Sequence, residues 1–127
     1  MIPTREYVLE ELFKVRATLR SFGVRRIAVF GSVARNTARA DSDIDIVVDI
    51  PRGQITIENF FGLQDFLNDH FQRKVDVITE SSVKPFARDL VMRDAVFLEG
   101  LQSLNRKKKE RFRKRRDVAN KGLNSFR

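Results

Sequence analysis

Residues 29–48 organise this chain, and they read Val-Phe-Gly-Ser-Val-Ala-Arg-Asn-Thr-Ala-Arg-Ala-Asp-Ser-Asp-Ile-Asp-Ile-Val-Val. An apolar run ends at Gly31 and Ser32, and a second apolar run opens with two aspartates, Asp43 and Asp45. Side chains alternate along a strand, so we expect both aspartates on one face, with Cα atoms about 7 Å apart, and Ile44 in the core. Carboxylate oxygens are the ligands that Mg²⁺ prefers, together with substrate phosphates.

The Gly31-Ser32 pair predicts a second kind of site. Glycine permits a positive φ or a close backbone approach, and Ser32 is a favourable N-cap for a helix starting there. The free N–H groups of a helix start bind anions. A Gly-Ser pair is usually a simple turn, and an Asp-x-Asp pair usually lies in a solvated loop. With ten residues between Ser32 and Asp43, the two together favour a phosphate cradle beside a metal site, and hence nucleotide chemistry.

The fuller pattern, Gly31-Ser32-x-x-Arg35 followed by Ser42-Asp43-x-Asp45, resembles the nucleotidyltransferase superfamily of the DNA polymerase β type. It is most similar to the minimal nucleotidyltransferases, small prokaryotic proteins of which many are antitoxins paired with a HEPN toxin. The resemblance covers roughly residues 5–99. It implies the polymerase β-like nucleotidyltransferase fold.

Hydrophobic periodicity gives the order of elements along the chain. We expect a helix at 4–21 capped by Gly23, a strand at 25–30, a short helix at 32–36 and a strand at 44–50. A helix at 57–71, a strand at 73–79 and a helix at 84–98 capped by Gly100 follow. Layer rules then predict an α/β domain with a small mixed β-sheet and flanking helices.

Asp76 is the third candidate carboxylate. It lies between Val75 and Val77 in a predicted strand, so it points away from the core. The residues alone leave two interpretations open, a third ligand or a surface aspartate that neutralises Lys74. The resemblance implies that Asp76 belongs to the catalytic set and accepts the proton of the attacking hydroxyl.

The resemblance also implies how the site would work. Asp43 and Asp45 would bridge two Mg²⁺ ions, and Asp76 would bind the ion nearer the acceptor. Gly31 and Ser32 would hold the triphosphate of ATP. Arg35 either contacts a phosphate or the acceptor, or it forms a structural ion pair with the aspartates.

The implied function is that of a Mg-dependent protein adenylyltransferase, the antitoxin of a HEPN/MNT toxin–antitoxin pair. AMP would pass from ATP to a toxin side-chain hydroxyl, with tyrosine favoured. The chain lacks the arginine-histidine-tyrosine motif of the HEPN toxins, and it is short for the superfamily, so we expect the acceptor to bring its own recognition surface. The alternatives are an antitoxin acting by complex formation without catalysis, or a nucleotidyltransferase with a small-molecule or RNA acceptor.

Composition bounds the remaining possibilities. The chain has 127 residues, 42% of them hydrophobic, and no cysteine, which fits one modest domain without disulfides. Its one histidine, His70, lies near a predicted helix end, so we do not expect a zinc site. No stretch reaches the roughly 18 apolar residues that a membrane span needs. We expect a cytoplasmic protein.

The net charge of +8 is unevenly distributed. Residues 101–127 hold eleven lysines and arginines against Glu110 and Asp117, whereas residues 1–100 carry 14 basic and 15 acidic groups. We therefore expect a nucleotidyltransferase domain at 1–100 and a basic C-terminal tail at 101–127, disordered or an appended helix. Nucleic acid would bind only through this tail, which could instead grip an acidic partner or have no function.

Overall fold

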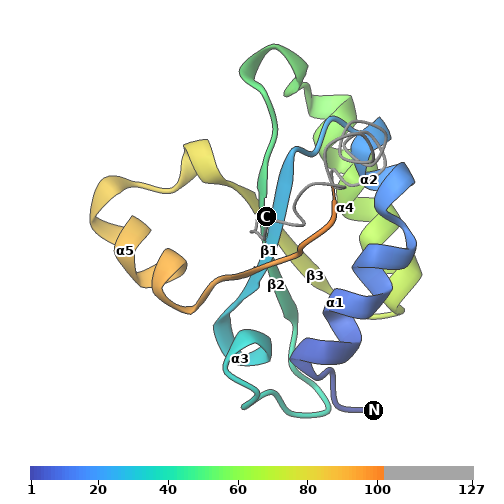
Figure 1. Cartoon of the computed structure of the whole chain (residues 1–127), viewed down its shortest axis with the longest axis vertical. Coiled ribbons are helices and arrows are strands. Elements are labelled where there is room, and N and C mark those ends of the chain that lie inside the picture. Colours follow the sequence, from blue (N-terminus) through green and yellow to red (C-terminus); the bar gives the residue numbers. More distant parts are fainter. Residues whose placement is uncertain (102–127) are drawn as a thin grey trace, which may run out of the picture.

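The computed structural model describes residues 1–101, and Figure 1 shows how its elements follow one another. In chain order they are α1 (Arg5–Lys14), α2 (Arg16–Ser21), β1 (Arg26–Phe30), α3 (Gly31–Ala34), β2 (Ile44–Asp49), the 3-10 turn η1 (Arg52–Gln54), α4 (Ile57–Phe71), β3 (Val75–Thr79), the 3-10 turn η2 (Glu80–Ser82), α5 (Pro85–Asp94) and β4 (Val96–Phe97). Most of the predicted basic tail, residues 102–127, lies outside the described residues.

The strands form one mixed sheet in the order β3-β2-β1-β4. β1 pairs antiparallel with β2 and β4, and β2 pairs parallel with β3. The parallel pair is possible because α4 carries the chain back along the sheet between β2 and β3. The predicted α/β fold with a small mixed sheet and flanking helices is therefore confirmed.

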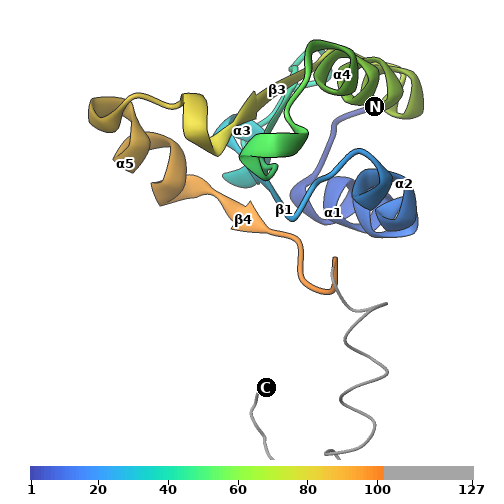
Figure 2. The ribbon, with the colours of Figure 1, turned by 90° about the horizontal axis from the view of Figure 1, so that it is seen from above.

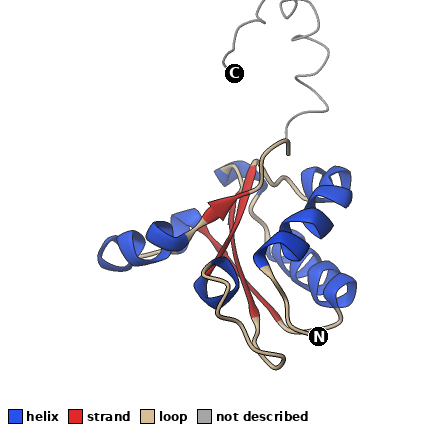
Figure 3. Cartoon of the chain, turned by 60° about the horizontal axis from the view of Figure 1, so that its bottom comes forward, coloured by secondary structure: helices blue, strands red, loops and turns tan. Residues whose placement is uncertain are grey.

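The helices divide unequally between the two faces of the sheet. Figures 2 and 3 show α1, α2 and α4 stacked on one face, while α5 extends on the other side. Ile44 and Ile46 of β2 are fully buried in the core beneath the stacked helices, as alternation along the strand predicts. Asp45 therefore faces the opposite side, which we call the open face of the sheet.

The predicted single helix at 4–21 is broken into α1 and α2 at Val15. The predicted start is correct, because the Thr4 side chain accepts a hydrogen bond from the Tyr7 amide. Val15 leaves the helical region with φ −105° and ψ 22°, and its amide bonds to Leu12 in a tighter turn. The side chain of Arg16 donates to the carbonyl of Phe13 at 2.8 Å, so a side chain satisfies a group that the break frees.

The predicted helix at 84–98 is also too long, because α5 ends at Asp94 and the chain continues as β4. Ala95 is extended, and Val96 and Phe97 pair with Val29 and Ala28. This pairing covers the edge of β1, which would otherwise expose unpaired backbone groups. Gly100 consequently lies in a turn after β4, with φ +88°, rather than capping a helix.

The Leu101 side chain, at the end of the described residues, is 3% exposed and packs in the core. His70 also has a structural partner, because its Nε2 atom lies 3.0 Å from Oε1 of Glu11 and so connects α4 to α1. Within residues 1–101, no helix is long and apolar enough to span a bilayer.

Candidate active site

The turn between β1 and α3 requires glycine for two separate reasons. Gly31 adopts φ +69°, a conformation that is strained for other residues. A Cβ built at this position would also lie 2.4 Å from Oδ2 of Asp45. Phe30 and Asp45 are partners in the antiparallel ladder, so the backbone of the turn passes directly against the Asp45 carboxylate. The two predicted halves of the site are thus in contact.

Ser32 is not the N-cap that its sequence position predicts. The helix begins at Gly31, its N-cap is Phe30, and that cap has no side-chain hydrogen bond. Ser32 instead lies in the first turn of α3, where the leading N–H groups have no partner within the helix. The hydrogen-bond donors at the start of α3 are therefore backbone amides, and they lie next to Asp45.

The three predicted aspartates come together on the open face of the sheet. Asp45 of β2 and Asp76 of β3 are direct partners in the parallel ladder. Asp43 precedes β2 by one residue and shares a face with Asp45, two residues away. The surrounding residues Ile44, Val75 and Val77 are buried on the other side.

Burial and the neighbouring carboxylates both shift the pKa of Asp45. Burial raises the pKa of the Asp45 carboxyl above its usual value, and the neighbouring charges of Asp76 and Asp43 raise it further. The positive charges of Arg35 and Lys74 act in the opposite direction on this pKa. Like charges held close together disfavour ionisation unless a cation compensates them.

Lys74 supplies part of that compensation. Its Nζ atom lies 3.6 Å from Oδ2 of Asp43 and 3.5 Å from Oδ1 of Asp76. These two carboxylates raise the pKa of the Lys74 ammonium. Asp76 thus does pair with Lys74, as one of the two interpretations expected. The same ammonium also lies beside Asp43, so this pair is part of the acidic cluster. The sequence did not indicate that Lys74 also reaches Asp43.

Arg35 has a partner that the sequence did not reveal. It does not pair with the cluster aspartates, because its Nη1 atom lies 2.9 Å from Oδ2 of Asp94 at the end of α5. The contact joins α3 to a helix 59 residues further along the chain. The Arg35 side chain remains half exposed, so the guanidinium stays accessible beside the turn.

The donor set suits a hard divalent cation in its chemistry. Within residues 1–101, no three acidic, histidine or cysteine side chains are gathered closely enough to form a ready-made metal site. The three cluster aspartates nevertheless share one face and offer only oxygen donors, and the charges of Asp76 and Asp43 add to the effect of burial in raising the pKa of Asp45. Carboxylate oxygens with substrate phosphates are the set that Mg²⁺ takes. The chemistry of these donors therefore fits this ion.

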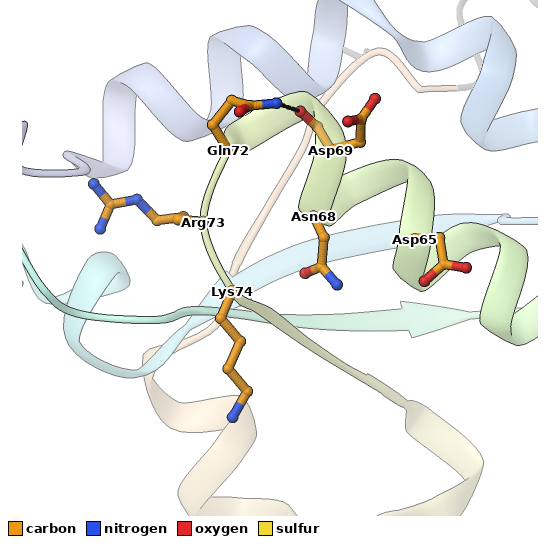
Figure 4. Close-up of a pocket in the computed structure, with 6 residues that line it drawn as sticks. All are labelled: Asp65, Asn68, Asp69, Gln72, Arg73 and Lys74. Atoms are coloured by element: carbon orange, nitrogen blue, oxygen red, sulfur yellow. Dashed lines mark hydrogen bonds between the residues drawn. The ribbon is translucent and has the colours of Figure 1, made fainter.

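A hollow of about 510 Å³ lies beside the cluster, at the end of α4. It is lined by Asp65, Asn68, Asp69, Gln72, Arg73 and Lys74. Figure 4 shows that these side chains point in different directions, with the Lys74 side chain directed away from α4. The Gln72 amide is occupied by the carbonyl of Asp69 at 2.6 Å. The polar groups do not converge on a common point, so the hollow has no evident ligand of its own.

A model of the nucleotidyltransferase domain matches residues 9–98, which include the turn and all three aspartates. The chain belongs to this family. It is therefore a nucleotidyltransferase, and the resemblance seen in the Gly31-Ser32 and Asp43-x-Asp45 motifs is confirmed.

Two relatives illustrate the family. A protein of Methanocaldococcus jannaschii, provisionally named as a protein adenylyltransferase, is 35% identical over 83 residues, which are 65% of this chain and 88% of the relative. Protein adenylyltransferase MntA of Thermococcus cleftensis is 38% identical over 77 residues, which are 61% of this chain and 77% of the relative. Both similarities extend well beyond the short motifs.

Solved structures share the fold. One is described, provisionally, as a minimal nucleotidyltransferase; it is 36% identical, has a TM-score of 0.58, and the match covers 69% of this chain and 93% of the other. Another belongs to a complex of a tri-AMPylated Shewanella oneidensis HEPN toxin with an MNT antitoxin, with 19% identity, a TM-score of 0.55 and coverage of 86% and 92%. At that identity the second match demonstrates the fold alone.

Proposed function

We propose that this nucleotidyltransferase transfers AMP from ATP to a side-chain hydroxyl of a HEPN-type toxin, with tyrosine favoured, and so acts as the antitoxin in the cytoplasm. The observation that carries the proposal is the close approach of the Gly31 turn to the Asp45 carboxylate, whose partner in the parallel ladder is Asp76. Relatives named for protein adenylylation and a fold shared with an MNT antitoxin support the choice of a protein acceptor.

The chain's own residues divide the reaction between them. The first backbone amides of α3 would hold phosphate oxygens of ATP, and Asp43, Asp45 and Asp76 would hold Mg²⁺. Bound Mg²⁺ would neutralise charge on the phosphates and on the attacking and leaving oxygens. The acceptor oxygen forms a bond to the α-phosphorus, the bond to the β-phosphate breaks, and pyrophosphate leaves. Asp76 would take the hydroxyl proton.

The open face leaves room for a macromolecular acceptor. Phe86 and Leu90, one turn apart on α5, are 81% and 58% exposed, and α5 contains no buried residue. The ion pair between Arg35 and Asp94 holds this helix against the turn. Apolar side chains gathered beside a reaction site are typical of a protein contact. We assign the HEPN partner to this surface of α5.

The experiment is co-expression with a HEPN-type protein encoded with this one, followed by intact and peptide mass spectrometry. We expect an added adenosine monophosphate on one or more partner tyrosines, and its loss when those tyrosines are changed to phenylalanine. An Asp43→Asn, Asp45→Asn double variant serves as the inactive control. If that variant neutralises the toxin as effectively as the wild type does, the antitoxin acts by complex formation and the proposal is wrong.

A further inference from the structure

Lys74 is placed between two of the three cluster aspartates by the backbone of the sheet. The Ile44 amide donates to the Lys74 carbonyl at 3.1 Å, which extends the parallel ladder and sets Lys74 beside Asp43. Lys74 and Asp76 are two residues apart, so their side chains share the open face. The ammonium then lies 3.6 Å from Asp43 and 3.5 Å from Asp76.

The neighbouring Arg73 differs from Lys74 because its guanidinium binds backbone carbonyls and holds segments of the chain together. Its guanidinium donates to the carbonyls of Ala40, Ser42 and Met1 at 3.1, 2.8 and 2.5 Å, and so fastens the loop before β2 to the start of β3. Within the described residues Lys74 makes no comparable backbone contact, and its ammonium pairs with the carboxylates of Asp43 and Asp76. Its side chain is 67% exposed, which leaves the ammonium free to change position.

The position of the ammonium conflicts with a metal ion. A divalent cation that uses the oxygens of both Asp43 and Asp76 needs the space and the charge compensation that Lys74 now supplies. Lysine is a compact charge on a flexible stem, so it can leave the carboxylates without backbone movement. Once released, the ammonium would need another anionic partner, and the triphosphate of the proposed function would supply one.

We propose that Lys74 is an internal counter-cation that occupies the carboxylates of Asp43 and Asp76 until metal and nucleotide arrive together. The metal alone must displace the ammonium into water, whereas metal with nucleotide offers the ammonium a new partner. Metal and nucleotide therefore bind cooperatively, and by linkage each raises the affinity for the other by the same factor. The inference rests on the metal site proposed above.

The test is calorimetric titration of Mn²⁺ into the full-length protein, with and without a non-hydrolysable ATP analogue. Two exposed ion pairs are modest in energy, so we expect Lys74→Met to bind Mn²⁺ alone about threefold to tenfold more tightly than the wild type. The nucleotide analogue should raise the affinity for Mn²⁺ by a smaller factor in this variant than in the wild type. Lys74→Arg keeps the charge and should retain weak binding of Mn²⁺ alone.

Thermal unfolding gives a second readout that does not depend on catalysis. Without metal, Lys74→Met should melt at a lower temperature than the wild type, because the carboxylates of Asp43 and Asp76 then lack their ammonium. Excess Mn²⁺ should raise the melting temperature of this variant by more than it raises that of the wild type. Lys84→Met, an exposed lysine preceding α5, is the matched control and should change neither measurement.

Two outcomes would overturn the inference, and they are distinguishable. If the wild type binds Mn²⁺ and Lys74→Met binds it with equal or lower affinity, Lys74 is not a competing cation, and the proposed function stands. If neither protein binds Mn²⁺, even with the nucleotide analogue, the metal site itself is wrong and both proposals fail.

Discussion

Asp45 and Asp76 face one another as partners in the parallel ladder between β2 and β3. The chain separates them by 30 residues, including the whole of α4. Their pairing places two acidic groups on neighbouring strands, where like charges oppose each other. This pair, with Asp43 beside it, creates a local excess of negative charge that the Lys74 ammonium offsets in part. The predictions below follow from this arrangement.

Replacing Asp43 or Asp45 by asparagine should abolish nucleotidyl transfer while leaving the protein folded. Both side chains lie on the open face, and the buried residues of the strand, Ile44 and Ile46, are unchanged. Removing a charge from the cluster should leave the melting temperature equal to or slightly above that of the wild type. Transfer of radiolabelled AMP and thermal unfolding check the two parts. Full transfer activity in both variants would contradict the catalytic assignment.

The ionisation of Asp45 should contribute to the pH dependence of the free energy of unfolding. Its pKa in the folded protein lies above the ordinary value of 3.8, so the folded state binds this proton more tightly than the unfolded chain. The resulting stabilisation is complete below the ordinary pKa and is lost as the pH rises through the higher folded pKa. We expect the metal-free wild type to lose stability relative to Asp45→Asn over that range. Urea unfolding of both proteins between about pH 3 and pH 7 measures their free energies of unfolding. The prediction is wrong if the wild type keeps or gains stability relative to Asp45→Asn over this range.

Gly31→Ala should damage both stability and activity. The new methyl group would lie 2.4 Å from the Asp45 carboxylate, and φ is +69°, so the turn must distort. We expect a loss of about 1–3 kcal/mol in the free energy of unfolding, together with weaker binding of an ATP analogue. Gly53→Ala is the matched control, because no atom lies within 4 Å of the added Cβ. Equal behaviour of the two variants would show that the close approach at Gly31 is unimportant.

The ion pair between Arg35 and Asp94 allows two roles of Arg35 to be distinguished, a contact to a phosphate of ATP and the positioning of α5. If Arg35 contacts a phosphate, Arg35→Met should raise the KM for ATP, whereas Asp94→Asn should not, because it leaves the guanidinium in place. Both variants should lose less than about 1 kcal/mol of stability, since the Arg35 side chain is half exposed. Steady-state kinetics with unfolding curves distinguish the cases. An equal rise in KM in both variants would assign Arg35 to the positioning of α5.

The α5 surface predicts a defect confined to the protein acceptor. A Phe86→Ser, Leu90→Ser double variant should retain its melting temperature and its binding of an ATP analogue, because both side chains are exposed. Its rate of AMP transfer to the partner should fall by about tenfold or more, as for the loss of a central apolar contact. The matched control is Ile57→Ser, Phe61→Ser, which removes exposed apolar groups from α4. An equal loss in both variants would refute a specific role for α5.

Several features of the protein follow from local sequence alone. Residues 57–71 form the predicted helix, because its apolar spacing persists over four turns and Thr56 caps its start by accepting from the Asn59 amide. The sequence also showed that Asp76 faces away from the core, since it alternates with Val75 and Val77. Gly31 was recognisable because an apolar strand ends abruptly there. Such signals depend on residues within one or two turns of each other.

Other features depended on contacts between distant segments. The register that brings Asp45 opposite Asp76 is set when α4 packs and returns the chain, and it also places Lys74 between Asp43 and Asp76. The pairing of β4 with β1 replaces the end of a predicted helix, because covering a free strand edge outweighs a weak helical preference. The sequence by itself therefore determined which strands carry the three aspartates and where the Gly31 turn falls. Tertiary packing decided the pairing of Lys74 with Asp43 and of Arg35 with Asp94, because these ion pairs join segments that no local pattern connects.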